Sequence, residues 1–214
     1  MFNVIFTMSK IPGDWKKGII VPLHKKGSLN DPNNYRAISL LPIFSKILTS
    51  VLNKRLMNWS NELGVITEMQ AGFRKGYSTT DHIFALNTII HKYLRKKRGR
   101  LYCVFVDFRK AFDLIRREKL WYKLHQLGIR GHFLNILKEY YDDVSSCVRT
   151  SDGCTEYFEF QFGLRQGCNF SPQLFSFFIN ALVDCFNQNN IRGIHIFDTD
   201  ITCLMYADDI ILFF

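Results

Sequence analysis

The chain has 214 residues, of which 47% are hydrophobic and 15% are aromatic, and its formal net charge is +9. This length allows a sizeable core in one domain or two subdomains. The high aromatic content, including 20 phenylalanines, excludes an intrinsically disordered chain. No apolar run reaches the roughly 18 residues that a membrane-spanning helix requires, so we predict no membrane segment.

The six cysteines form no C-x-x-C pair, and no histidine lies at zinc-ligand spacing from them. Several of them lie in apolar runs, which predicts buried free thiols. Free thiols favour a reducing, intracellular compartment. The first eight residues are too short for a signal peptide and lack its flanking pattern.

Charge is distributed unevenly along the chain. Residues 1–149 carry 26 of the 28 lysines and arginines but 11 of the 19 acidic residues, a formal charge of +15. Residues 150–214 carry 2 basic and 8 acidic residues, a formal charge of −6. The basic part therefore predicts a polyanionic partner such as a phosphate backbone, with ordinary solvated charge as the alternative.

The first half of the chain predicts one strand and two helices. We expect the strand at residues 19–23, a helix that Pro42 opens, and a second helix that Ser78 and Asp81 cap. The basic run 95–98 follows the second helix and is either a solvated helix end or a nucleic-acid contact. The apolar faces predicted for the two helices comprise Phe44, Ile47, Leu48, Val51, Leu52, Leu56 and Trp59, and Ile83, Phe84, Ile90 and Leu94.

The second half alternates strands and helices without repeats or linkers. Its predicted elements are a strand buried on both faces at 101–106, helices at 118–127 and 132–141, a hairpin at 147–160, an apolar helix from Ser171 to about Asn187, and a final hairpin of 201–205 with 210–214. This order suits an α+β fold.

The final hairpin turns at Tyr206-Ala207-Asp208-Asp209. Tight hairpins usually place glycine there because the turn requires a positive φ angle, but this turn has none. A turn that breaks the local rule is a candidate for a strained functional site. The alternative interpretation is an ordinary solvated turn containing aspartate.

A second acidic residue, Asp107, ends the apolar run at 101–106. If this strand lies beside the hairpin, Asp107, Asp208 and Asp209 converge. Three carboxylates suit Mg²⁺, and two such ions support in-line phosphoryl or nucleotidyl transfer. Alternatively, Asp107 and Asp113 only cap the helix that follows, whose first turn favours acidic residues.

Five motifs occur in the order typical of one known family. They are NYRAISLLP at 34–42, QAGFRKGYST at 70–79, FVDFRKAFD at 105–113, GLRQGCNFSP at 163–172 and YADD at 206–209. Together they resemble reverse transcriptases of non-LTR (LINE-like) retrotransposons over essentially the whole chain.

The resemblance implies a right-hand polymerase fold of fingers plus palm, in which helices back an antiparallel palm sheet. Residues 1–100 would form a basic fingers-like region and residues 101–214 the palm. The implied activity is RNA-directed DNA synthesis by two-metal nucleotidyl transfer from a deoxynucleoside triphosphate to a primer 3′-hydroxyl. Two Mg²⁺ ions, for which Mn²⁺ can substitute, would be held by Asp107, Asp208 and Asp209.

By resemblance, two groups of residues surround those acids. Nucleotide-binding roles fall on Lys25 or Lys26 with Arg36 at the triphosphate, on Phe112 as a steric gate against the 2′-hydroxyl, and on Gln166 and Gly167. Arg74, Lys75, Arg165 and Tyr206 would meet the template or primer; for Arg165 a surface position is the alternative.

The implied partners are an RNA template, a DNA primer and deoxynucleotides, in the nucleus or the cytoplasm and without a membrane. The chain resembles fingers and palm truncated before the thumb, from a longer polyprotein with an endonuclease, so we expect little activity from it alone. The last strand, from Ile210, would be an exposed sheet edge. Alternatives are a non-catalytic nucleic-acid-binding remnant, a group II intron or telomerase-type enzyme, and an RNA-dependent RNA polymerase.

Overall fold

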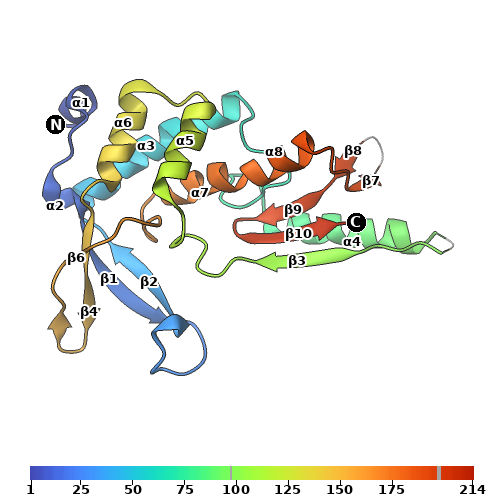
Figure 1. The fold of residues 1–214 in the computed structure, drawn as a ribbon, viewed down its shortest axis with the longest axis horizontal. Helices are drawn as coiled ribbons and strands as arrows, with labels where there is room; N and C mark the ends of the chain where they lie inside the picture. Colours follow the sequence, from blue (N-terminus) through green and yellow to red (C-terminus); the bar gives the residue numbers. More distant parts are fainter. Residues whose placement is uncertain (97, 197–198) are drawn as a thin grey trace. The chain divides into compact units, whose positions relative to one another are not determined.

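The computed structural model describes residues 1–96, 98–196 and 199–214, which form two compact units (Figure 1). The first unit comprises Met1–Asn58 and Phe112–Ser171, and the second comprises Trp59–Ala111 and Pro172–Phe214. These units are defined by contacts between residues, whereas the predicted division after residue 100 separates the fingers-like region from the palm. The two divisions are of different kinds, so the predicted one stays a prediction.

The first unit contains a five-stranded sheet in the order β2-β1-β4-β5, with β6 also paired to β4. Strand β1 is antiparallel to β2 and parallel to β4, and β5 and β6 are antiparallel to β4. The predicted strand at 19–23 and the predicted hairpin at 147–160 are confirmed as β1 and as β4 with β5. The elements are α1 (Phe2–Met8), α2 (Gly13–Lys16), β1 (Lys17–His24), the 3-10 helix η1 (Pro32–Asn34), β2 (Tyr35–Leu40), α5 (Arg117–Gln126), α6 (Gly131–Tyr141), β4 (Ser145–Thr150), β5 (Gly153–Cys154) and β6 (Phe158–Glu159).

Helices α5 and α6 supply much of the core of this unit and lie close to the predicted ranges 118–127 and 132–141. Leu124 of α5 and Leu137 of α6 are fully buried. The aromatic rings of Tyr140, Tyr141 and Phe170 pack edge to face, with centroids 5.0 to 5.9 Å apart. Such pairs add stabilisation beyond the buried area of the rings.

Helix α3 (Ile43–Glu62) begins after Pro42 as predicted, but its predicted apolar face is only half correct. Leu48, Leu52 and Leu56 are buried, whereas the side chains of Phe44, Ile47 and Val51 are exposed. The buried stripe is completed by Ser45, Thr49 and Ser60, and Ser45 Oγ lies 2.9 Å from the hydroxyl of Tyr140. Polar residues can occupy a buried face when they form hydrogen bonds there. A prediction from the periodicity of apolar residues alone therefore assigned part of the buried face of α3 to the wrong side.

The second unit contains a three-stranded antiparallel sheet in the order β3-β10-β9 and a separate β7–β8 pair. Helix α4 packs on the three-stranded sheet through a cluster of Ile89, Ile194, Ile196, Leu204 and Phe213. The elements are α4 (Thr79–Leu94), β3 (Cys103–Asp107), α8 (Ala181–Gln188), β7 (Ile194–Ile196), β8 (Thr199–Ile201), β9 (Cys203–Tyr206) and β10 (Asp209–Phe213), with α7 (Ser171–Ile179) beginning at the division between the units.

The single apolar helix predicted for 171–187 is wrong, because α7 and α8 are separated at Asn180. The side chain of Asn180 turns to the loop before α4 instead. Its Oδ1 accepts a hydrogen bond from the Thr67 amide at 2.9 Å, and its Nδ2 donates to the Val65 carbonyl at 3.3 Å.

The capping box predicted for α4 is confirmed. Its predicted apolar face is mostly wrong, because only Ile90 of its four residues is half-buried. Ile83, Phe84 and Leu94 are exposed, while Ile89 is buried and Ala85, Leu86 and Tyr93 pack around it. The basic run that follows the helix includes Lys97, which lies outside the described residues.

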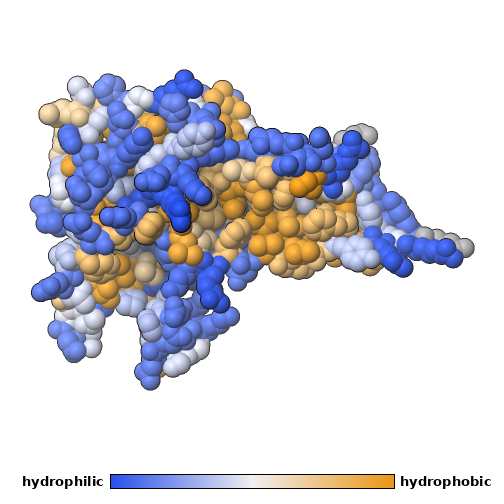
Figure 2. Space-filling view, in the orientation of Figure 1, coloured by the Kyte–Doolittle hydropathy of each residue, from blue (hydrophilic) through white to orange (hydrophobic). Residues whose placement is uncertain are grey.

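The predicted sheet edge at the end of the chain is also wrong, because β10 is the central strand between β3 and β9. Phe213 is buried, and only Phe214 is exposed. Strand β3 lies at one edge of this sheet. Its Val104 and Phe105 are exposed, whereas Leu101 and Cys103 pack against the cluster around Ile89. Figure 2 shows the resulting apolar surface over this sheet, so the strand is not buried on both faces as predicted.

None of the described helices is long and apolar enough to cross a membrane. All six cysteines are free thiols, and Cys147, Cys168 and Cys203 are buried as the apolar runs predicted.

Replacing Ser78 by alanine should destabilise the chain by about 1 kcal/mol, the usual effect of losing a helix N-cap. Ser78 Oγ accepts from the Asp81 amide at 3.4 Å, and Asp81 Oδ2 accepts from the Ser78 amide at 2.7 Å. Urea unfolding measures the change. Ser78→Thr keeps the hydroxyl and should change little; equal stability of Ser78→Ala and the parent would contradict the role of the cap.

Candidate functional site

The acidic turn joins β9 to β10 and has two residues, Ala207 and Asp208. Tyr206 pairs with Asp209 across it. Ala207 adopts a φ angle of +58° without being glycine. The left-handed conformation is unfavourable for residues that carry a Cβ atom, so the predicted backbone strain in this turn is confirmed.

The pairing of β10 with β3 places Asp209 directly opposite Asp107. Residues paired in this way point to the same face of a sheet and lie close, so their like charges repel. Both residues are exposed, and Asp208 beside them in the turn is half-buried. In the part of the chain that the structure describes, no lysine, arginine or histidine forms an ion pair with any of the three.

The register therefore brings together the backbone positions of Asp107 and Asp209, as the sequence predicted. Among residues 1–96, 98–196 and 199–214, however, no three acidic, histidine or cysteine side chains gather closely enough to form a metal site as they stand. The chemistry of the three residues nevertheless fits Mg²⁺, which prefers oxygen ligands and would neutralise the uncompensated charge.

A segment that sequence reasoning assigned no role, residues 69–72, lies against this turn. The amides of Ala71 and Met205 donate to the carbonyls of Met205 and Met69 at 2.9 and 2.8 Å. The buried side chain of Gln70 hydrogen-bonds to the backbone of Ala207. Gln70 and Gly72 belong to the motif at 70–79, but the sequence does not indicate that they contact Ala207.

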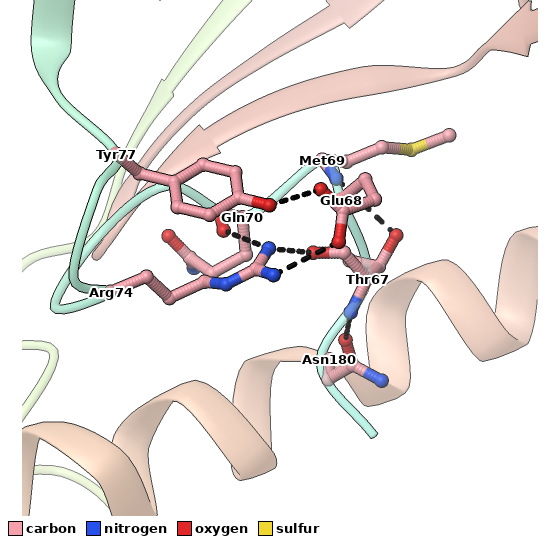
Figure 3. A network of polar contacts seen from close by, with 7 residues as sticks. All are labelled: Thr67, Glu68, Met69, Gln70, Arg74, Tyr77 and Asn180. Atoms are coloured by element: carbon pink, nitrogen blue, oxygen red, sulfur yellow. Dashed lines mark hydrogen bonds and ion pairs between the residues drawn. The ribbon is translucent and has the colours of Figure 1, made fainter. Parts of the chain in front are cut away.

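The loop that carries Gln70 is braced by a polar network (Figure 3). Arg74 Nη1 donates to the carbonyls of Thr67 and Gln70, both at 3.1 Å, and Arg74 Nη2 pairs with Glu68 at 2.9 Å. The Tyr77 hydroxyl donates to the other oxygen of Glu68, and the Arg74 guanidinium lies 3.9 Å from the centre of the Tyr77 ring. Arg74 therefore donates its hydrogen bonds to groups within the chain, whereas Lys75 is exposed.

In the first unit, the loop of residues 163–168 packs on β2 and on residues 112–113. The Ser39 amide donates to the Gln166 carbonyl at 2.7 Å, and Gln166 Nε2 donates to Asp113 at 3.2 Å. Gly167 has a φ angle of +113°, and a Cβ there would lie 2.5 Å from the Ser39 carbonyl oxygen, so only glycine fits.

Phe112 belongs to the same neighbourhood, because its carbonyl accepts from the Leu164 amide at 2.8 Å. The structure thus brings together three of the predicted nucleotide-binding residues, Phe112, Gln166 and Gly167. The other three, Lys25, Lys26 and Arg36, lie exposed on the hairpin of β1 and β2. Arg36 pairs with Leu23, and the Lys25 amide donates to the Asn34 carbonyl at 2.8 Å.

Arg165 is not the surface residue considered as an alternative, because only 2% of it is exposed. Its Nη2 donates to the Lys16 carbonyl, and its guanidinium lies 5.6 Å from the centre of the Tyr140 ring. This burial does not support the predicted contact with a phosphate, which stays untested.

An antiparallel sheet in which a strand-ending aspartate lies opposite the first aspartate of a neighbouring strand, directly after a turn that carries a third, is typical of a palm-type polymerase domain. The fold agrees with solved structures of telomerase. Telomerase from Candida tropicalis, in complex with a fragment of telomeric RNA, aligns with a TM-score of 0.66 and 13% sequence identity over 95% of this chain and 37% of that one.

Sequence comparison gives the family. Residues 23–214 match the family described as reverse transcriptase (RNA-dependent DNA polymerase). The probable RNA-directed DNA polymerase from transposon BS of Drosophila melanogaster is 31% identical over 100% of this chain and 23% of its own length. The RNA-directed DNA polymerase from mobile element jockey of Drosophila funebris is 28% identical over 98% of this chain and 22% of its own length.

The chain therefore belongs to the reverse transcriptase family, and its relatives are proteins of non-LTR retrotransposons. It spans less than a quarter of the length of the two relatives described. Enzymes of this family generally use divalent metal ions.

Replacing Tyr77 by phenylalanine should raise the pKa of Glu68. The hydrogen bond from Tyr77, followed by that from Arg74, holds the pKa of this carboxyl below its ordinary value of 4.5. A depressed pKa contributes stability above pH 4.5 that is lost as the pH falls through the lowered value, and Tyr77→Phe should shrink that loss.

Carbon-13 NMR titration of the Glu68 carboxyl measures this shift. The exposed Tyr102→Phe serves as the control and should leave the titration unchanged. An unchanged pKa in Tyr77→Phe would show that the hydroxyl does not bind the carboxylate in solution.

Proposed function

We propose that this chain is the part of an RNA-directed DNA polymerase that carries its catalytic carboxylates. The observation that supports this most is the register of β3 and β10, which sets Asp107 opposite Asp209 with Asp208 in the adjoining turn. Like-charged carboxylates without a cationic partner are the arrangement expected where divalent ions bind.

Asp107 and Asp208 would be the principal ligands of two Mg²⁺ ions, and Asp209 would be the third carboxylate. When bound, such ions lower the pKa of an attacking hydroxyl and neutralise charge that develops on a triphosphate. Positioning and charge neutralisation dominate phosphoryl-transfer chemistry, so the chain needs no side-chain general base.

The reaction would join the primer 3′-oxygen to the α-phosphorus of a deoxynucleoside triphosphate. The bond between the α-phosphorus and its bridging oxygen breaks, and pyrophosphate leaves. The hydroxyl proton would pass to solvent.

Phe112 would act as the gate that selects the sugar. A bulky apolar ring has no room for a 2′-hydroxyl and offers it no hydrogen bond, which favours deoxynucleotides. Gln166 and Gly167 would contribute to the same nucleotide contact, and the glycine permits close approach of the backbone.

The basic residues would meet phosphates. Arg36 with Lys25 or Lys26 suits a triphosphate, because arginine binds phosphate oxygens in a bidentate manner and lysine supplies a point charge. Lys75 and Tyr206 are proposed to contact template or primer, and Arg74 would do so only if it gave up its bonds to Glu68 and to the backbone. The partners would be an RNA template and a DNA primer, in the nucleus or the cytoplasm.

Asp208→Asn should reduce DNA synthesis on a primed RNA template with Mg²⁺ by at least about 100-fold, since even residues behind metal ligands affect activity 10- to 100-fold. The same substitution should weaken binding of Mn²⁺ to the chain, which calorimetry measures independently of turnover. Asp184→Asn changes an aspartate of α8 outside the acidic turn and is the matched control.

Three outcomes separate the functions considered. Synthesis or Mn²⁺ binding that vanishes only in Asp208→Asn supports a metal-dependent polymerase. Salt-sensitive RNA binding without Mn²⁺ binding or synthesis would favour a non-catalytic nucleic-acid-binding protein. Better use of ribonucleotides than deoxynucleotides by the parent chain would favour an RNA polymerase.

Phe112→Val should raise incorporation of ribonucleotides relative to deoxynucleotides by at least about tenfold, the scale on which pocket shape discriminates substrates. Single-nucleotide extension with each substrate gives the ratio of kcat/KM values. Phe158→Val, at an exposed strand residue, should leave the ratio unchanged. An unaltered ratio in Phe112→Val would show that Phe112 does not select against the 2′-hydroxyl.

A further inference from the structure

The side-chain amide of Gln70 binds both backbone polar groups of Ala207, the residue before Asp208. Gln70 Oε1 accepts from the Ala207 amide at 2.9 Å, and Gln70 Nε2 donates to the Ala207 carbonyl at 3.2 Å. Gln70 is completely buried. The amide therefore takes the place of a neighbouring strand, because it donates to and accepts from one residue as a β-sheet partner does.

The same amide is fixed from its own side. Gln70 Oε1 also accepts from the Gly72 amide at 2.7 Å, so the side chain has little freedom to rotate away from the turn. A Cβ on Gly72 would lie 2.2 Å from the Ala207 nitrogen, so only glycine allows the loop this close to the turn.

The loop that carries Gln70 is attached to the rest of the second unit at several points. The Asn180 side chain binds Thr67, and Arg74 binds the carbonyls of Thr67 and Gln70 (Figure 3). The backbone pairs with β9 through Ala71 and Met205. The position of the amide is therefore set by the fold and not by the acidic turn alone.

The turn requires such support. Ala207 holds a φ angle of +58°, which an alanine adopts only when its surroundings enforce it. Asp208 follows in the chain, so the conformation of Ala207 determines where the Asp208 carboxylate points. Repulsion among three neighbouring carboxylates would tend to open a turn that nothing restrained.

We propose that Gln70 is a positioning residue, which holds Ala207 in the left-handed conformation and thereby sets the Asp208 carboxylate for binding a divalent cation. This inference rests on the proposed function, because it assigns to Gln70 the geometry of the same acidic site. The amide acts on the backbone of the turn and touches no substrate.

The test replaces Gln70 by methionine, which keeps the length of the side chain and removes its donor and acceptor. Mn²⁺ alone is titrated into the full chain and followed by calorimetry. We expect at least about a tenfold weaker Mn²⁺ affinity, the effect typical of residues that orient metal ligands. The exposed Gln188→Met, in the same unit, should bind Mn²⁺ like the parent.

A second substitution shows whether Gln70 acts through the turn. Glycine adopts positive φ angles readily, so Ala207→Gly lowers the need for support. The loss of Mn²⁺ affinity caused by Gln70→Met should be at least about threefold smaller in the Ala207→Gly background, a coupling that a double-mutant cycle measures. If the losses of Mn²⁺ affinity from the two substitutions simply add, Gln70 does not act through the conformation of Ala207.

Asn180→Ala controls for simple destabilisation. It removes two hydrogen bonds that attach the same loop, to the Thr67 amide and the Val65 carbonyl, but none to Ala207. It should therefore lower the unfolding temperature without a comparable loss of Mn²⁺ affinity. If Gln70→Met does not fold, as judged by circular dichroism, Gln70→Asn provides the same test, because its shorter amide cannot reach both groups of Ala207.

The outcomes distinguish this inference from the proposed function. Parent chain that binds Mn²⁺ through Asp208, together with folded Gln70→Met that binds equally well, overturns the role of Gln70 alone. Parent chain that binds no Mn²⁺ overturns the proposed function and this inference together. Equal losses of affinity in Gln70→Met and Asn180→Ala would reduce Gln70 to a stabilising residue.

Discussion

The antiparallel pairing of β10 with β3 is the contact on which the acidic site depends. It aligns the end of one strand with the start of another from a distant part of the chain, and so places Asp107 opposite Asp209. A shift of one residue in this register would send one of the two carboxylates to the other face of the sheet. The apolar cluster around Ile89 holds the register, because β3, β9 and β10 all contribute side chains to that cluster.

This alignment has an electrostatic and a conformational consequence. The electrostatic one is repulsion between neighbouring carboxylates, which a bound cation would relieve. The conformational one is the left-handed Ala207, which the loop of Gln70 and Gly72 supports through hydrogen bonds and close packing. A turn that is unfavourable by itself is thus stabilised by a segment distant from it in the sequence.

Sequence patterns predicted the kinds of elements well and their surroundings less well. The capping box at Ser78, the two short hairpins and the central helices all depend on neighbouring residues, and these were predicted. The buried faces of α3 and α4 were misjudged, since periodicity identifies an apolar stripe but not which neighbours cover it. Ile83 and Phe84 have the right residue types for a core and are nevertheless exposed.

The sequence by itself determined the family, the three acidic residues and the strained turn, because these follow from residue types at fixed local spacing. Only the tertiary structure decided that Asp107 faces Asp209, that β10 is central, that Arg165 is buried and that Gln70 holds Ala207. Each of these depends on contacts between residues far apart in the chain. Such contacts are selected by packing and hydrogen bonding in the whole fold, which no local pattern encodes.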